Sequence, residues 1–316
     1  MSKDVITLGE SLVAFIPDTH TKLRYVHQFG KVVVGAESNV AVGLAKLGFS
    51  TGWVSKVGND EFGQFMIREL KAEGVDTSSV IISDEGPTAI MFKQFSNALD
   101  TSVFYYRTGS AASTMHKDSI DWEYMKETRI IHISGITSAI SESCRDLVEA
   151  VFAFAKQEHL LVSFDPNIRL KLMTEEKARN VLAPLLFRAD IVLLGEDEGR
   201  VLLGTENPEE IAKILLENGC SYIGVKQGSH GAYVADSTNG FFIDPYPVKV
   251  VDTIGAGDAF NTGFLAGLLD DQPIDRCGSM GALLGALAVS SHGDVEGLPD
   301  GKTFHQLMDN KKEIHR

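Results

Sequence analysis

The chain has 316 residues, 44% of them hydrophobic and 23% charged, which is enough apolar material for one large folded domain or two modest ones. Lys and Arg number 29 and Asp and Glu 43, and the resulting net charge of −14 argues against nucleic acid or an anionic membrane as a partner. The three cysteines are far apart and form no CxxC pair, which excludes a zinc ribbon and a disulfide framework. There is no signal-peptide pattern and no apolar run of about 18 residues, so we expect a cytoplasmic protein.

Strands and helices are predicted to alternate along most of the chain. The expected strands are Val5–Leu8, Thr51–Val57, Ile130–Ser134, Leu160–Phe164, Ile191–Leu194 and Tyr222–Lys226. The expected helices are Ser38–Leu47 with Ser38 as its N-cap, Glu61–Ala72, Ser141–Gln157, Glu175–Leu186 and Pro208–Glu217. This alternation predicts a mostly parallel sheet flanked by helices, in a single α/β domain over residues 1–316.

Two segments, 12–34 and 88–107, interrupt the alternation with period-2 patterns and few helix formers. We interpret them as a small β-sheet that projects from the main domain and acts as a lid over a site. The alternative is a surface hairpin with no role in ligand binding. Towards the C-terminus, the pattern predicts a strand over Val248–Val251 and helices over Gly257–Leu269 and Gly278–Ser290.

The segment Val251-Asp-Thr-Ile-Gly-Ala-Gly-Asp-Ala-Phe260 combines an expected strand end, a glycine-rich turn and a helix that begins near Asp258. Backbone N–H groups at such a helix N-terminus form an anion site. Asp258 stands at its edge, where a carboxylate could either cap the helix or accept a proton from an attacking hydroxyl. The dinucleotide-binding motif is excluded, because Phe260 occupies the place of its third glycine.

Three further residues or turns could contact a ligand. Arg107 ends the second inserted segment, and Arg169 follows the expected strand Leu160–Phe164, at the sheet edge where ligands of open α/β sheets gather. Two guanidinium groups could hold a carboxylate or phosphate, although either one taken alone is more simply a surface arginine. The turn Gly224–Gly231 could approach a nucleotide or be a plain hairpin.

Taken together, these segments resemble the ribokinase (PfkB) family of sugar kinases over nearly the whole chain. The matching motifs are Gly35-Ala-Glu-Ser-Asn-Val-Ala-Val-Gly-Leu-Ala-Lys-Leu-Gly48, Val57-Gly-Asn-Asp-Glu-Phe-Gly63 and Asp252-Thr-Ile-Gly-Ala-Gly-Asp258. Within the family the chain is most similar to 2-keto-3-deoxygluconate kinases, through Pro87-Thr88, Tyr105-Tyr-Arg-Thr-Gly-Ser-Ala111, Ser134-Gly-Ile-Thr137 and Asp165-Pro-Asn-Ile-Arg169. The resemblance implies a ribokinase-like α/β fold with a small β-sheet lid.

The resemblance also implies a role for particular residues. It places Gly35, Asn39, Tyr105, Arg107, Ile136, Arg169 and Asp294 at the sugar, with both arginines facing its carboxylate. It places Lys226, Gly228 and Gly231 on the nucleotide, and makes Asp258 the base, with the N–H groups of Gly255, Ala256 and Gly257 stabilising the transferred phosphoryl group. The chain departs from the family at Gly195-Glu-Asp-Glu198, where only Glu198 remains to act on magnesium through water, and at Met91, where some sugar-acid kinases have tyrosine.

The implied reaction is ATP-dependent phosphorylation of 2-keto-3-deoxy-D-gluconate at its terminal hydroxyl, with Mg2+ arriving on ATP and a monovalent cation near Asp252 as a possible helper. The alternatives are a fructokinase or another neutral-sugar kinase of the family, and a sugar- or nucleotide-binding regulator without turnover. An exposed apolar face on the lid would favour a homo-oligomer.

Overall fold

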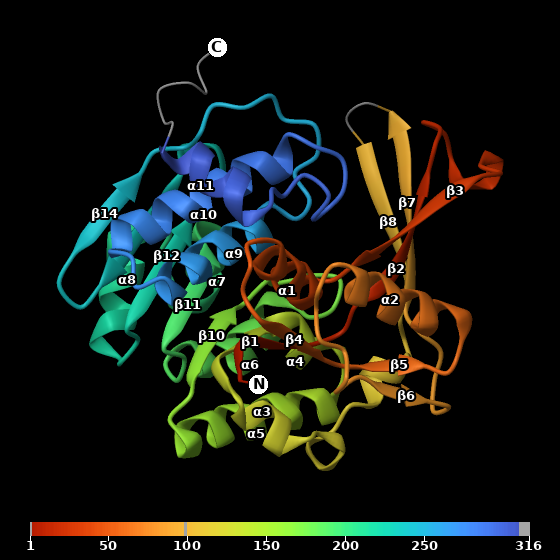
Figure 1. The fold of residues 1–316 in the computed structure, drawn as a ribbon, viewed down its shortest axis with the longest axis horizontal. Coiled ribbons are helices and arrows are strands. Elements are labelled where there is room, and N and C mark those ends of the chain that lie inside the picture. The colour runs from red at the N-terminus through yellow and green to blue at the C-terminus, as the bar shows by residue number, and fades with distance from the viewer. Residues whose placement is uncertain (1, 98–99, 310–316) are drawn as a thin grey trace.

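The computed structural model describes residues 2–97 and 100–309. Its centre is an eight-stranded sheet in the order β14-β13-β12-β11-β10-β9-β1-β4 (Figure 1). The strands are β1 Lys3–Leu8, β4 Thr51–Val54, β9 Thr128–Ser134, β10 Leu161–Asp165, β11 Ile191–Gly195, β12 Tyr222–Lys226, β13 Ala232–Asp236 and β14 Gly240–Ile243. Neighbouring strands from β4 to β12 are parallel, and β13 and β14 are antiparallel additions at one edge. The expected mostly parallel sheet is confirmed.

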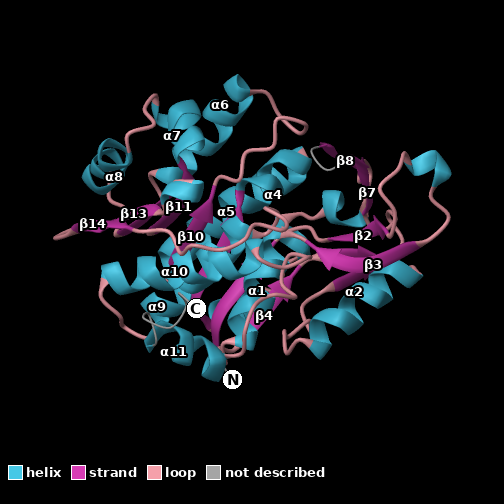
Figure 2. Ribbon diagram, turned by 90° about the horizontal axis from the view of Figure 1, so that it is seen from above, coloured by secondary structure: helices cyan, strands magenta, loops and turns pink. Residues whose placement is uncertain are grey.

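Helices cover both faces of this sheet (Figure 2). One layer holds α3 Trp122–Lys126, α4 Gly135–Ile140, α5 Glu142–Glu158, α6 Glu175–Leu186, α7 Glu196–Leu203 and α8 Pro208–Glu217. The other holds α1 Ala36–Lys46, α9 Ala256–Leu269, α10 Ile274–Val289 and α11 Gly301–Asp309. None of the helices in the described part of the chain is both long and apolar enough to cross a membrane.

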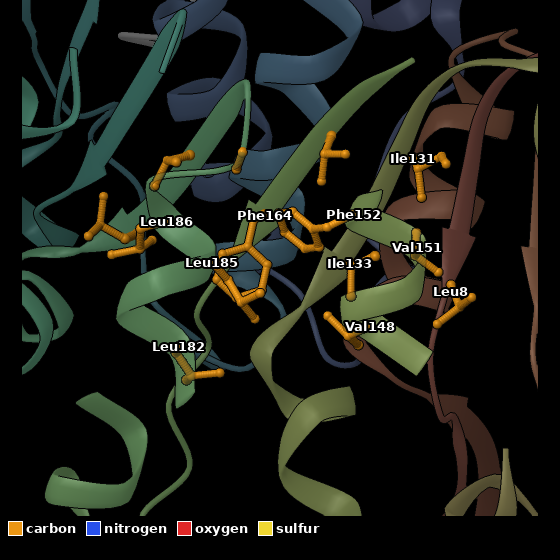
Figure 3. Packing of buried hydrophobic residues seen from close by; sticks show 14 of the residues in the cluster. Leu8, Ile131, Ile133, Val148, Val151, Phe152, Phe164, Leu182, Leu185 and Leu186 are labelled. Carbon is orange, nitrogen blue, oxygen red and sulfur yellow. The ribbon is translucent and has the colours of Figure 1, made fainter. Parts of the chain in front are cut away.

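Apolar side chains alternate between the two faces of the strands and produce two cores. In β9, Ile131 and Ile133 face α5 and α6, whereas Ile130 faces α1 and α9. Figure 3 shows the first core, where Phe164 of β10 packs between side chains of α5 and α6. Each such fully buried side chain stabilises the fold by about 1.5–3 kcal/mol.

The two inserted segments form one four-stranded sheet in the order β3-β2-β7-β8, which projects from the main body (Figure 1). Its strands are β2 Leu12–Pro17, β3 Phe29–Val34, β7 Ile90–Asn97 and β8 Asp100–Tyr106. Strands β2 and β7 are parallel, and the two outer pairs are antiparallel. On one face, Phe15 and Phe92 stack, and Phe15 meets Phe62 of α2 (Glu61–Ala72) edge to face. We call this sheet the small sheet. A separate pair, β5 Lys56–Gly58 and β6 Ile81–Ser83, lies beside it.

Four expected elements, α2, α6, α8 and β12, have the predicted bounds, but other expectations are wrong. Helix α1 begins at Ala36 with Gly35 as its N-cap, because Ser38 donates to the Gly35 carbonyl oxygen instead of capping (3.1 Å). The expected strand Thr51–Val57 is divided between β4 and β5, which belong to different sheets.

The segment 248–251 is not a strand, and Val250 and Val251 are 58% and 43% exposed. Helix α10 starts four residues before the expected Gly278, at Ile274. The single domain over 1–316 stays a prediction, and its residues 1, 98–99 and 310–316 lie outside the described part.

Candidate active site

The glycine-rich turn before α9 is the segment predicted to bind an anion, and we call it the anion site. Gly255 is the N-cap with φ 80°, a left-handed conformation that favours glycine. A Cβ atom on it would lie 2.9 Å from Cα of Asp294, so the turn is packed tightly against that segment. The N–H groups of Ala256 and Gly257 in the first helical turn have no acceptor within the helix. Such N–H groups can bind an anion, and anion binding at this turn stays a prediction.

Asp258 is the third residue of α9, so the capping alternative is wrong. Its Oδ2 accepts a hydrogen bond from Asn39 Nδ2 (2.8 Å), and the same nitrogen donates to Oδ2 of Asp294 (3.1 Å). Burial raises the pKa of Asp258 to about 7, and the negative charges of Asp165 and Asp294 add to the rise, against the Asn39 bond. A carboxyl with a pKa near neutral is suited to accept a proton from a hydroxyl at physiological pH.

A cavity of about 580 Å³ opens beside the anion site. Its lining includes Lys226, the last residue of β12, then Gly228, Ser229 and Gly231 of the turn that follows, and Thr253, Ala256 and Gly257 around the start of α9. The remaining wall is mostly apolar and comes from Pro245, Tyr246, Pro247, Val248, Val250, Phe260, Ala282, Gly285, Ala286 and Val289. The segment around 248–251 is therefore a cavity wall, which explains an apolar run that is not a strand. The volume and the mixture of an apolar wall with a few polar groups suit a small organic ligand.

The turn after β12 is a hairpin, and its approach to a nucleotide stays a prediction. It joins β12 to the antiparallel β13, so it is a hairpin, and Gly228 and Gly231 also line the cavity. Gly231 has φ 90°, and a Cβ atom on it would lie 2.0 Å from the carbonyl oxygen of Ile243. Glycine is therefore required at position 231 for the cavity to keep its shape.

Lys226 brings a positive charge to the anion site. Its Nζ lies 3.6 Å from the place a Cβ on Gly257 would occupy. It donates to Oδ2 of Asp165 (2.8 Å) and to Oδ1 of Asn261 (3.3 Å). Burial alone would lower the pKa of Lys226, but the carboxylates of Asp165 and Glu198 hold it above the usual range. Asp165 and Asn261 were missed as site residues, although Asp165 directly follows the expected strand Leu160–Phe164, at the sheet edge where ligands gather.

Glu198 lies beside this cluster, with both carboxylate oxygens engaged. Oε1 accepts from the backbone N–H of Ile168 (2.7 Å) and Oε2 from that of Gly195 (2.8 Å). Burial raises its pKa, and the neighbouring Asp165 raises it further. The hydrogen bond from Ile168 to Glu198 Oε1 fixes the loop that carries Arg169. The described residues contain no group of three or more His, Cys, Asp or Glu arranged to hold a metal ion.

A buried carboxyl, Glu37, joins the expected sugar-binding segments. Its Oε1 accepts from the N–H (3.1 Å) and Oγ (2.7 Å) of Ser134 and from Oγ1 of Thr137 (2.8 Å). These bonds fix the start of α1, with Gly35 and Asn39, against the start of α4. Ile136 lies in that first turn of α4. Burial raises the pKa of Glu37.

Arg107 is not a surface arginine. Its side chain is 11% exposed and forms an ion pair with Glu10, which is completely buried and also accepts from Ser110 Oγ (2.5 Å). The Nε of Arg107 is buried without a hydrogen-bond partner among the described atoms. Because Glu10 neutralises part of its charge, Arg107 is a weaker anion-binding group than the sequence indicates.

Arg169 lies in an exposed loop that also reaches the small sheet. Lys171 of this loop donates to the carbonyl oxygen of Val103 (3.2 Å), and its Nζ lies 5.8 Å from the ring centroid of Tyr105. The guanidinium of Arg107 lies 5.7 Å from the same ring. The Arg169 loop, Tyr105 and Arg107 therefore lie close together, and their contact with a sugar stays a prediction.

Sequence reasoning also missed Lys93. This residue of β7 is 1% exposed, and its ammonium lies 3.9 Å from Oδ2 of Asp252 and 4.0 Å from Oδ1 of Asp294. A lysine in the middle of an alternating strand is ordinarily solvent-facing, so only the tertiary structure reveals it.

Comparison with known proteins places this geometry in context. The model of the pfkB family of carbohydrate kinases matches residues 2–301. A 2-dehydro-3-deoxygluconokinase from Bacillus subtilis (strain 168) is 38% identical over 100% of this chain and 98% of its own. The protein of the same name from Thermoproteus tenax is 33% identical over 96% of this chain and 94% of its own. A solved E. coli protein assigned as Ribokinase II, in complex with ATP and Mg2+, has a TM-score of 0.90 at 28% identity, covering 97% of this chain and 99% of that one.

Proposed function

This chain belongs to the pfkB family of carbohydrate kinases, and we propose that it phosphorylates 2-keto-3-deoxy-D-gluconate on its terminal hydroxyl with ATP. The observation that carries the proposal is the placement of a raised-pKa carboxyl, Asp258, at an anion site beside a nucleotide-sized cavity. The substrate class is supported by the names of the two relatives, because 2-dehydro-3-deoxygluconate is another name for the same sugar acid.

In the proposed reaction, Asp258 accepts the proton of the sugar's terminal hydroxyl as its oxygen attacks the γ-phosphorus of ATP. The N–H groups of Ala256 and Gly257, with that of Gly255 before them, stabilise the negative charge that develops on the transferred phosphoryl group. Lys226 adds a fixed positive charge close to Gly257. The adenosine part of ATP would lie against the apolar wall of the cavity, near Gly228 and Gly231.

The residues present fit a magnesium ion that is carried by ATP. Carboxylate oxygens are the hard donors that Mg2+ prefers, and Glu198 is the carboxylate at this edge of the sheet that we assign to it. Glu198 would act on it only through water, because both of its oxygens already accept backbone N–H bonds. Bound magnesium would neutralise phosphate charge.

We assign the substrate carboxylate to Arg169, with Arg107 as the second donor. Arg169 forms no ion pair among the described residues, whereas Arg107 already pairs with Glu10. The remaining sugar contacts would come from Gly35, Asn39, Tyr105, Ile136 and Asp294. The small sheet would act as a lid that excludes water and so limits ATP hydrolysis.

The test is a coupled assay of ADP formation with a panel of sugar acids and neutral ketoses. We expect the highest kcat/KM for 2-keto-3-deoxy-D-gluconate. Faster turnover of fructose would favour the fructokinase alternative, and ATP binding without turnover of any sugar would favour a regulator.

We also propose a homo-oligomer, a cytoplasmic location and a monovalent cation near Asp252. The exposed aromatic residues Phe104 (44%) and Tyr106 (64%) on the small sheet support a homo-oligomer, which light scattering would test. The three buried free thiols, Cys144, Cys220 and Cys277, agree with a reducing, cytoplasmic location, which fractionation would test. A monovalent cation near Asp252 is tested by comparing rates in potassium and tetramethylammonium salts.

A further inference from the structure

Lys93 is a buried charge that the proposed reaction does not yet use. It lies in β7 of the small sheet, and its cross-strand partner is Val103 of β8. Met91, two residues earlier, shares its face of the sheet, opposite the face that carries Phe92. Burying an ammonium group costs free energy unless opposite charges compensate it. Asp252 and Asp294, both about 4 Å from Nζ, provide that compensation.

These two carboxylates belong to the segments that frame the start of α9. Oδ1 of Asp252 accepts from the N–H of Ile254 (3.1 Å), which shapes the turn that leads to Gly255. Asp294 packs against Gly255 from the other side, and its Oδ2 accepts from Asn39, which in turn donates to Asp258. One lysine of the small sheet therefore faces both walls of the anion site and is linked to the base through two residues, Asp294 and Asn39.

We propose that Lys93 is a positioning residue for phosphoryl transfer, which ties the small sheet to the Asp252 and Asp294 segments and thereby fixes the anion site and Asp258. This inference rests on the proposed kinase function. Lys93 is not assigned to the substrate carboxylate, because its single positive charge already faces two carboxylates. The local net charge is negative, which repels a third carboxylate.

The experiment compares Lys93→Met with Lys93→Arg and with a matched control, Lys31→Met. Lys31 lies in β3 of the same small sheet, is exposed, and has its ammonium 4.1 Å from the ring centroid of Phe65. The control therefore removes the same charge from the same sheet, away from Asp252 and Asp294. We measure kcat and KM with 2-keto-3-deoxy-D-gluconate and with fructose, and the melting temperature of each variant.

We expect Lys93→Met to lower kcat about a hundred-fold, the usual effect of misplacing reacting groups by about 1 Å. The fractional loss should be similar for both sugars. Lys93→Arg should recover most of the rate, because it restores the charge, and Lys31→Met should stay within about twofold of wild type. Hydrogen exchange without substrate should speed up in β7 and around 252–254 in Lys93→Met only.

Four results would overturn the inference. An unchanged kcat in Lys93→Met would show that the lysine positions nothing. A loss confined to the sugar acid would make Lys93 a substrate ligand instead. Failure of Lys93→Arg to recover the rate, together with a lowered melting temperature in both variants, would reduce Lys93 to a folding role. A wild-type protein that phosphorylates no sugar would refute the proposed function. Unaltered hydrogen exchange in Lys93→Met would refute the link between the small sheet and the Asp252 and Asp294 segments.

Discussion

Replacing Asp258 by Asn is expected to remove catalysis and at the same time stabilise the fold at alkaline pH. The pKa of this carboxyl is about 7 in the folded protein and about 3.9 in an unfolded chain. The folded state therefore binds the proton more tightly than the unfolded state does. Its contribution to stability is present at low pH, is lost as the pH rises from about 4 to about 7, and is fully absent above that. The amide side chain of the variant would carry no charge at any pH.

The size of the effect follows from the pKa difference. A difference of about three units corresponds to about 4 kcal/mol at pH 8. Asp258 is partly open to solvent, so we expect screening to reduce this to about 2 kcal/mol. For a chain of this size, that raises the melting temperature by about 3–6 °C. At pH 5 the gain should be much smaller.

The assay is a set of thermal melts of wild type and Asp258→Asn at pH 5, 6.5 and 8, with kcat measured on the same samples. Asp18→Asn is the control, because Asp18 is exposed and its replacement should change the melting temperature little. The Asp258→Asn variant should lose two to four orders of magnitude in kcat. The wild-type rate should itself fall as the pH drops through about 7, because the base becomes protonated. The reasoning is refuted if Asp258→Asn keeps more than about a tenth of kcat or gains no stability at pH 8.

Three further changes test the substrate, magnesium and nucleotide assignments. Arg169→Ala should cut kcat/KM for the sugar acid about ten- to a hundred-fold, and Arg169→Lys should restore part of this. The loss of kcat/KM for fructose should be much smaller. Equal fractional losses on both sugars would show that Arg169 does not bind the substrate carboxylate. Glu198→Gln leaves one of the two backbone N–H groups without its acceptor, so KM for the sugar acid should rise as the Arg169 loop loosens. The magnesium concentration for half-maximal rate should rise as well, and an unchanged value would leave Glu198 a loop-holding residue only. Gly231→Ala should raise KM for ATP at least about tenfold, because its Cβ has no room beside Ile243; an unchanged KM for ATP would mean that this turn does not shape the nucleotide cavity.

The elements that the sequence predicted accurately have strong local signals. Helices α2, α6 and α8 start after Asp60, Thr174 and Asn207, whose side chains accept the first backbone N–H bonds. Helix α1 has no such residue at its start. Its N-cap, Gly35, packs so tightly against Ser11 that a Cβ on Gly35 would lie 2.9 Å from Cα of Ser11. The local sequence does not reveal that contact.

The sequence predicts the parts of the candidate site that lie in one short turn. It does not predict the parts that depend on contacts between residues far apart in the chain. The residue types of the Gly255–Asp258 turn are enough to predict an anion site. The pairing of Arg107 with Glu10 joins residues almost a hundred positions apart, and Lys93 meets carboxylates still further along the chain. An apolar run such as 248–251 has the same composition whether it forms a strand or lines a cavity, so periodicity could not separate the two.

The cavity beside the anion site has a lining that comes entirely from the stretch between Lys226 and Val289. The side chains assigned to the sugar, from Gly35 to Arg169, come almost all from the first 170 residues of the chain. The two substrates are thus served by different regions of the gene. Mutations that retune the preferred sugar can accumulate in the first region without disturbing the handling of the nucleotide. A scaffold divided in this way can diversify its acceptors while keeping one phosphoryl donor, and chimaeras that exchange only the N-terminal region should inherit the sugar preference of that parent.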